Sequence, residues 1–398
     1  MHVLRKFGLF AIASGLLVHA QPYPVLDDAI INEINAIGLT TFASLFPAIL
    51  GTKTGFSLTN RLTIGTNSSL FIPSNDAFKE LSLDTMDDEL VAKIISYHIV
   101  QGNYYCNDTK NILAEDLPKT TIARTLLDDP DYVQLQKNLS QVLIWGRNKE
   151  VNGKPVVELL HQPSTTTVLA SHLVQGYAIF VIDHVLTIPP KLSSVLDTPE
   201  TSKLKDIVGS SKFHTTTPDR KSIRILEFFD GRDYLHGFTL FAPNNAAFDQ
   251  LGQQFSELSP ENVTLLLLNH AINRETLYST DFAKSIYPSI SGQATQFISN
   301  SSGTFVVSGE VTAKILSTDR LEKGDFVMTH VMIFFDYIQL IAKRSQVESG
   351  HSSGVIPNIV TFSNPAQLPF SRLLVYSTLT VRQPYLAFSS PEHDPWQY

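Results

Sequence analysis

The stretch Thr239-Leu-Phe-Ala-Pro-Asn-Asn-Ala-Ala-Phe248 has a near copy 170 residues earlier, Ser69-Leu-Phe-Ile-Pro-Ser-Asn-Asp-Ala-Phe78. In each copy an apolar run stops at a proline, and polar residues suited to a helix N-cap follow it. The pattern predicts a buried strand, a turn and then a helix. Phe78 and Phe248 are expected to be early core residues of that helix.

Two further blocks of sequence recur in the same order. Ile94–Ile99 matches Leu267–Ile272, at the end of an apolar helical pattern, and Phe180–Leu186 matches Phe326–Met332, which has the character of a strand after a turn. Three matches in the same order predict two copies of one domain. Strands interleaved with helices in each copy indicate the α+β fold class.

The repeated blocks resemble the signatures of the fasciclin family of extracellular domains. Its first signature is similar to Thr-Leu-Phe-Ala-Pro-Thr-Asn-Glu-Ala-Phe, its middle Tyr-His element matches Tyr97-His98, and its closing signature is similar to Val181-Ile-Asp-His-Val-Leu-Thr-Ile-Pro189. In the second copy Asn269 replaces the tyrosine. The resemblance implies two tandem domains, each a β-wedge or sandwich beside a bundle of short helices. It also implies adhesion or matrix interaction rather than catalysis, as in fungal members with paired domains.

These observations divide the chain into a leader, two domains and a tail. Residues 1–20 combine Arg5 and Lys6 with an apolar run and a small residue at Ala20, which is typical of a secretory signal peptide. We expect a signal peptide at 1–20, domain one at 21–190 with an insertion at about 113–154, domain two at 191–340, and a tail of unknown structure at 341–398.

Composition narrows the functional classes. The 398 residues carry a formal charge of −8, and 43% of them are hydrophobic, which fits packed cores and does not favour nucleic-acid binding. Cys106 is the single cysteine, so no intrachain disulfide can form. Beyond the leader, no segment is long and apolar enough to span a membrane, and a secreted or extracellular location, at a cell surface or wall, is expected. The expected partners are extracellular or cell-surface proteins or glycans.

Glycosylation sequons fit a secreted chain. There are five of them, at Asn67, Asn107, Asn138, Asn262 and Asn300.

The repeated histidines admit two interpretations. His98 and His270 end apolar helices, so each ring can be buried and hydrogen-bonded to a nearby loop that it holds in place. The resemblance implies instead that Tyr97-His98, and more weakly Asn269-His270, contribute to a contact with a receptor. Both interpretations stay open at the level of sequence.

Other patterns yield weaker hypotheses. Gly350-His-Ser-Ser-Gly354 matches a serine-hydrolase nucleophile pattern, which makes a secreted hydrolase using Ser352 the alternative function, although its flanks do not suit a strand and a helix. Lys323-Gly-Asp325 fits a tight turn, and the dibasic pair Lys343-Arg344 could be a cleavage site. No catalytic residue, metal site or cofactor is expected from the spacing of histidines and carboxylates.

Overall fold

A computed structural model describes most of the region that contains both repeats. The described residues are 28–64, 67–104, 120–151, 154–217, 219–231, 235–282, 285–309, 311–319 and 329–330. Several sequence predictions lie outside these ranges: the signal peptide 1–20, Cys106, Asn107, Lys323–Asp325, Lys343-Arg344, Ser352 and the tail 341–398. No helix among the described residues is long and apolar enough to cross a bilayer.

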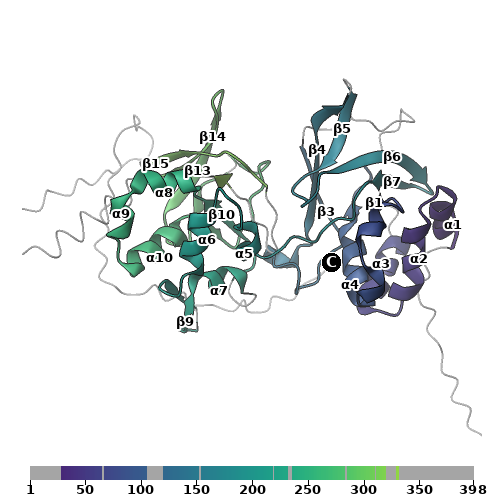
Figure 1. Ribbon diagram of the computed structural model, residues 1–398, viewed down its shortest axis with the longest axis horizontal. Helices are drawn as coiled ribbons and strands as arrows, with labels where there is room; N and C mark the ends of the chain where they lie inside the picture. The colour runs from purple at the N-terminus through teal and green to yellow at the C-terminus, as the bar shows by residue number, and fades with distance from the viewer. Residues whose placement is uncertain are drawn as a thin grey trace, which may run out of the picture. The chain divides into compact units, whose positions relative to one another are not determined.

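The first repeat places short helices before and between the strands of one sheet. Its elements are α1 (Asp28–Ala36), α2 (Thr40–Ile49), α3 (Lys53–Ile64), β1 (Ser68–Pro73), η1 (Ala77–Glu80), η2 (Leu83–Thr85), α4 (Asp88–Tyr97), β2 (Ile99–Gln101), β3 (Thr120–Arg124), η3 (Gln136–Asn138), β4 (Val142–Val151), β5 (Lys154–Leu159), β6 (Thr166–Val174) and β7 (Tyr177–Ile182). The α+β class is confirmed (Figure 1).

The second repeat has a similar succession of elements, with shorter helices at its start and an additional hairpin of β8 and β9 among them. They are α5 (Leu192–Val195), α6 (Ser202–Gly209), β8 (His214–Thr216), β9 (Ser222–Arg224), α7 (Ile225–Asp230), β10 (Phe238–Ala242), α8 (Asn245–Leu251), α9 (Gln253–Ser256), α10 (Pro260–Asn269), β11 (Ala271–Asn273), β12 (Tyr287–Pro288), β13 (Ala294–Asn300), β14 (Gly303–Ser308), β15 (Val311–Lys314) and β16 (Thr329–His330).

In the first repeat, one sheet of seven strands joins the beginning of the domain to its end. Its order is β2-β1-β7-β6-β5-β4-β3, and β1 pairs in parallel with β7 while the other neighbours are antiparallel. Among the described residues of the second repeat the corresponding strands form two sheets: β10 lies between β11 and β16 in one, and β12 to β15 form a meander in the other. The strand that carries the first repeated block therefore has a paired neighbour on both sides in each copy.

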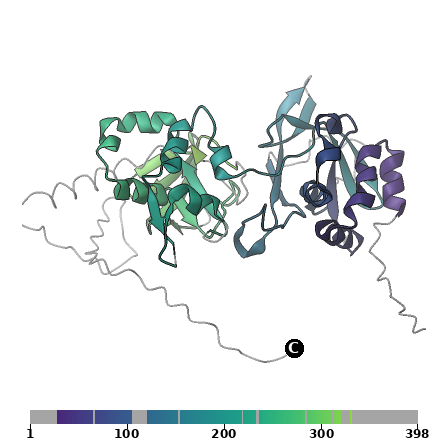
Figure 2. The ribbon, with the colours of Figure 1, turned by 60° about the horizontal axis from the view of Figure 1, so that its bottom comes forward.

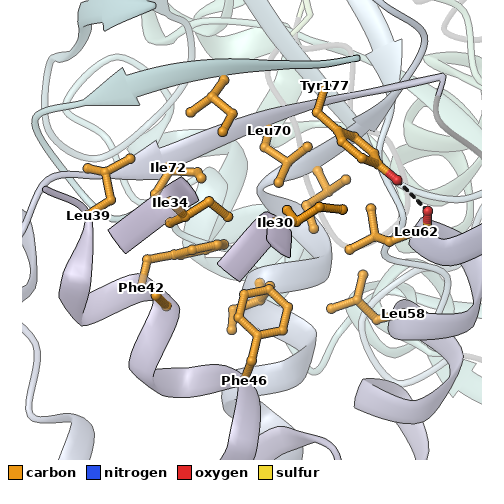
Figure 3. Packing of buried hydrophobic residues seen from close by; sticks show 14 of the residues in the cluster. Ile30, Ile34, Leu39, Phe42, Phe46, Leu58, Leu62, Leu70, Ile72 and Tyr177 are labelled. Carbon is orange, nitrogen blue, oxygen red and sulfur yellow. Dashed lines mark hydrogen bonds between the residues drawn. The ribbon is translucent and has the colours of Figure 1, made fainter. Parts of the chain in front are cut away.

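A helical layer covers one face of the first repeat's sheet. Helices α1 to α4 lie together on one side of β1 and β7, and Figure 2 shows the same grouping from a second direction. Alternation along β1 turns Leu70 and Ile72 towards these helices, where they meet Phe42 and Phe46 (Figure 3). The hydroxyl of Tyr177 donates a hydrogen bond to the carbonyl oxygen of Leu62, which ties β7 to α3.

An aromatic core covers the opposite face of the same strands. Phe71, which alternates with Leu70 and Ile72, stacks on Phe180 with ring centroids 5.0 Å apart and meets Trp145 at 5.1 Å. In the second repeat Phe241 takes the place of Phe71 and packs near Phe297, with 5.8 Å between centroids. Both faces of β1 and β10 are therefore buried, which explains their continuous apolar sequence.

The helix expected after the first block forms fully in only one copy. In the second repeat Asn244 is the N-cap of α8, and its side chain accepts a hydrogen bond from the backbone N–H of Ala247 at 3.0 Å. In the first repeat the corresponding residues form only the 3-10 turn η1. Phe78 and Phe248 are each 7% exposed, which confirms that both are core residues.

A pair of equivalent hydrogen bonds shows where the first repeat has more residues than the second. Thr125 donates its backbone N–H to the carbonyl of Gln141, and in the second repeat Ser289 donates to Gln293 in the same way. The two partners are 16 positions apart in the first copy and 4 in the second. Part of the additional length expected at 113–154 therefore lies between β3 and β4, and those two strands belong to the common sheet.

Candidate functional site

The asparagine shared by both copies of the first block clamps the chain to an earlier loop. Asn75 accepts from the N–H of Thr41 at 3.0 Å and donates to the carbonyl of Gly38 at 2.9 Å. Asn245 accepts from the N–H of Lys203 at 3.0 Å and donates to the carbonyl of Pro199 at 2.8 Å. The sequence pattern predicts capping residues here and does not reveal these hydrogen bonds to an earlier loop. The identical residue at an identical offset was the available clue.

Removing the Asn245 side chain tests how much its hydrogen bonds contribute to the free energy of unfolding. Asn245→Ala deletes the hydrogen bonds to the start of α6 and is expected to lower the free energy of unfolding by about 1–2 kcal/mol. Gln250→Ala, on the exposed side of α8, is the matched control and should change it by less than about 0.5 kcal/mol. Urea unfolding followed by circular dichroism measures both. Equal changes in the free energy of unfolding for the two variants would contradict a stabilising role for the Asn245 hydrogen bonds.

A buried hydroxyl near the start of β1, and of β10 in the second repeat, makes a second pair of equivalent hydrogen bonds. Ser69 donates to the carbonyl of Gly102 at 2.8 Å and accepts from the N–H of Tyr104 at 3.0 Å. Thr239 makes the same pair of bonds, to the carbonyl of Glu275 and from the N–H of Leu277. Ser69 and Thr239 are both 0% exposed. In each repeat one buried hydroxyl therefore holds the backbone that follows β2 or β11.

His98 joins helix α4 to the segment that follows β7. Its Nδ1 lies 2.8 Å from the carbonyl oxygen of Ile94, and its Nε2 accepts a hydrogen bond from the backbone N–H of Leu186 at 2.9 Å. A carbonyl can only accept, so Nδ1 carries the proton of a neutral ring. Desolvation of the fully buried ring lowers the pKa of His98 to about 4, against an opposing contribution from the Ile94 hydrogen bond.

His270 occupies the equivalent place in the second repeat. Its Nδ1 lies 2.7 Å from the carbonyl oxygen of Leu266, and burial lowers its pKa to about 4 as well. The neighbouring residue differs between the copies: Tyr97 belongs to the aromatic core, whereas Asn269 accepts hydrogen bonds from the hydroxyls of Ser289 and Ser291. The same position is therefore filled by an aromatic ring in one copy and by a buried polar network in the other.

These four residues lie inside the repeats. Exposed fractions are 0% for Tyr97, 2% for His98, 2% for Asn269 and 1% for His270. The cavity beside His98 has about 10 Å³, which is at the lower limit for a single water molecule. The arrangement matches the interpretation in which the histidine holds a loop. A contact role for these residues remains a prediction, and it would have to act through the backbone that they position.

A polar groove lies next to the closing segment of the first repeat. It has about 180 Å³ and is lined by Glu80, Gln162, Ser164 and His184, among others. His184 lies just after β7 with about a third of its side chain exposed, so the strand ends earlier than its sequence pattern predicts. The imidazole, amide, hydroxyl and carboxylate groups in this groove can hydrogen-bond a polar ligand.

Asp183 fixes one wall of this groove. Its carboxylate accepts hydrogen bonds from the N–H and hydroxyl of Thr167 at 2.7 and 2.6 Å, and Nδ1 of His184 lies 2.9 Å from it. Partial burial acts to raise the pKa of Asp183, but the hydrogen bonds from Thr167 and His184 outweigh it and the pKa is lowered. The described residues contain no cluster of three or more metal-ligating side chains.

Three comparisons place the chain among known proteins. A model of the fasciclin domain matches residues 39–189 and 211–332. A "Fasciclin-like arabinogalactan protein" of Arthroderma benhamiae is 22% identical over 231 residues, which are 56% of this chain and 48% of that protein, so the chain spans about half the length of this relative. The structure of a FAS1 domain pair from the insect cell adhesion molecule Fasciclin I has 13% identity and a TM-score of 0.33, covering 73% of this chain and 95% of the other.

The family match agrees with the repeat found in the sequence. Each matched region contains one copy of all three repeated blocks, from β1 or β10 to the closing strand. The two regions together make up well over half of the chain. This protein therefore belongs to the fasciclin domain family and carries two copies of the domain.

Proposed function

We propose that this protein is a secreted adhesion or cell-surface interaction protein, in which two fasciclin domains act together as a non-enzymatic binding unit. The observation that carries the proposal is the presence of two fasciclin domains in one chain. Fasciclin domains are generally associated with cell adhesion and the extracellular matrix. The leader-like residues 1–20 support a secretory location.

Two linked domains suit a surface with many copies of a weak ligand. Once one domain is bound, the second meets its ligand at a high effective concentration, and overall affinity can rise by about 10²–10⁴ without any new contact. The partners proposed are extracellular or cell-surface proteins or glycans. The buried Tyr97-His98 and Asn269-His270 pairs shape the fold, so exposed surfaces such as the groove beside His184 are the better candidates for direct contact.

Binding to surfaces tests the proposal. Purified residues 21–398 should bind intact cells or isolated wall material saturably, and residues 21–190 or 191–340 alone should bind at least about tenfold more weakly. Circular dichroism must first show that each single domain is folded. A folded full-length chain that binds none of these surfaces would contradict the adhesion role. Equal binding by one domain alone would contradict the cooperation of the two.

A further inference from the structure

The outer face of the β12–β15 sheet in the second repeat carries exposed apolar side chains. Alternation along β13 turns Phe297 into the core, where it is 6% exposed, and turns Ile298 outwards, where it is 46% exposed. Ile298 pairs across the sheet with the half-buried Phe305 of β14. Ile286, just before β12, and Leu316, two residues after β15, are 66% and 61% exposed, while Lys314 of β15 pairs with Phe305. Apolar side chains that gather on one face in this way indicate that something covers them.

The equivalent face of the first repeat is covered. Val142 and Ile144 of β4 point away from the aromatic core, yet they are only 1% and 0% exposed. Both belong to a cluster with Tyr278. The two faces correspond because bridges between Val100 and Thr125, and between Ile272 and Ser289, set the same register in each repeat. Among the described residues, no such cluster forms over Ile298.

Asn300 stands at the edge of this apolar face. It is the last residue of β13, two positions after Ile298, so the two residues share one face of the sheet. Asn300 pairs with Gly303 across a two-residue hairpin turn, and its Oδ1 accepts a hydrogen bond from the N–H of Ser302 at 2.8 Å. Asn300-Ser-Ser302 is a glycosylation sequon, and all three of its residues are exposed.

The other described sequons have a less accessible third residue. Ser69, the third residue of the Asn67 sequon, is 0% exposed, and its hydroxyl is used in the hydrogen bond to Gly102. The third residues of the Asn138 and Asn262 sequons, Ser140 and Thr264, are each 8% exposed. Among the described sequons, Asn300-Ser301-Ser302 is therefore the one in which all three residues are exposed.

We propose that Asn300 carries an N-linked glycan and that the first sugars of this glycan cover Ile298 and Phe305. A polyprenyl-diphosphate-linked oligosaccharide is the donor. The Nδ2–C1 bond to N-acetylglucosamine forms, the C1–O bond to the diphosphate breaks, and the Nδ2 proton is lost as the polyprenyl diphosphate leaves. The C–H face of the sugar ring and its acetyl methyl group can remove neighbouring apolar side chains from water.

The apolar face itself argues for this occupant. Asn300 lies on the same side of β13 as Ile298, and Ile298 faces Phe305 directly across the hairpin. A sugar attached at Asn300 therefore begins beside this pair and is held there covalently. The proposal rests on the secretory location in the proposed function and is independent of any surface binding.

Glycopeptide mass spectrometry of the chain secreted by a yeast host tests occupancy. Asn300 is expected to be occupied in most molecules, and more fully than Asn67 or Asn138. Ser302→Ala should abolish the glycan at Asn300, while Ser302→Thr should retain it. An unmodified Asn300 beside occupied sequons elsewhere would overturn the proposal while leaving the secretory location intact. A chain that carries no glycan at all would overturn both.

A fluorescent probe of apolar surface tests the covering role. Binding of anilinonaphthalene sulfonate to Ser302→Ala should exceed that to Ser302→Thr by about twofold, because the face is uncovered. Adding Ile298→Ser to Ser302→Ala should remove the increase. Equal probe binding by Ser302→Ala and Ser302→Thr, with Asn300 occupied only in the second, would overturn the covering role. Dimers that form only in Ser302→Ala, dispersed by Ile298→Ser, would support it.

Discussion

Acidification from pH 7 to pH 5 is expected to lower the free energy of unfolding by about 4 kcal/mol through the two buried histidines, about 2 kcal/mol from each. Each ring has a pKa of about 4 in the folded chain and an ordinary value of 6.5 when unfolded. The unfolded state therefore binds more protons between these values. The contribution of the neutral histidines to the free energy of unfolding is therefore complete above pH 6.5, and it is lost as the pH falls from 6.5 towards 4.

The hydrogen bonds of His98 give this prediction a geometric basis. A second proton on Nε2 would face the N–H of Leu186, so protonation must break that hydrogen bond as well as bring a charge into the core. In urea unfolding experiments, His98→Asn should reduce the decrease in the free energy of unfolding between pH 7 and pH 5 by about 2 kcal/mol. His236→Asn, at an exposed position, is the control. The same pH dependence in both variants and the parent would contradict this account.

Trp145→Ala is expected to lower the free energy of unfolding by about 3–5 kcal/mol, because it removes the largest fully packed side chain of the first repeat. The indole is 2% exposed, meets Phe71 at 5.1 Å between ring centroids, and meets Tyr104 edge-on at 4.9 Å. Its loss leaves a cavity against β1, which is paired with β2 and β7. Circular dichroism is the suitable readout, because the substitution also removes one of only two tryptophans.

Phe56→Ala provides the control for Trp145→Ala. Phe56 is 42% exposed, and its truncation should cost less than about 1 kcal/mol. Hydrogen exchange adds a local measurement: Trp145→Ala should reduce protection in β1 and β7 more than in β13 and β14. A loss spread evenly over both repeats, or a cost below that of Phe56→Ala, would contradict the packing described for the aromatic core.

The repeated blocks predicted most of the fold because their chemistry is local. A continuous apolar run ending at Pro73 or Pro243 specifies a buried strand, and the spacing of Leu90, Val91, Ile94 and Ile95 specifies the helix that became α4. The α+β class, the two domains and the core positions of Phe78 and Phe248 followed from these patterns. The core positions are determined by neighbours within about one turn or one strand, whereas the two domains followed from the recurrence of the blocks.

The features that the sequence did not reveal depend on distant partners. Asn75 and Asn245 look like capping residues, and only the folded chain brings the loop after α1 or α5 within reach of their amides. His98 could be assigned to a loop-holding role or to a contact surface, because burial cannot be read from one residue. The apolar outer face of β13 was missed for a similar reason. Ile298 has an alternating pattern that does not say which side faces the core.

The parallel pairing of β1 with β7 delays the folding of the first domain while the chain is being synthesised. Ser69 pairs with Ala178, so nearly the whole first domain must leave the ribosome before β1 acquires this neighbour. At about 5–20 residues per second, the strand waits for roughly 5–20 seconds with apolar side chains on both faces. High contact order of this kind slows folding. The nascent first domain thus depends on its helices, or on a chaperone, to shield β1 until translation delivers β7.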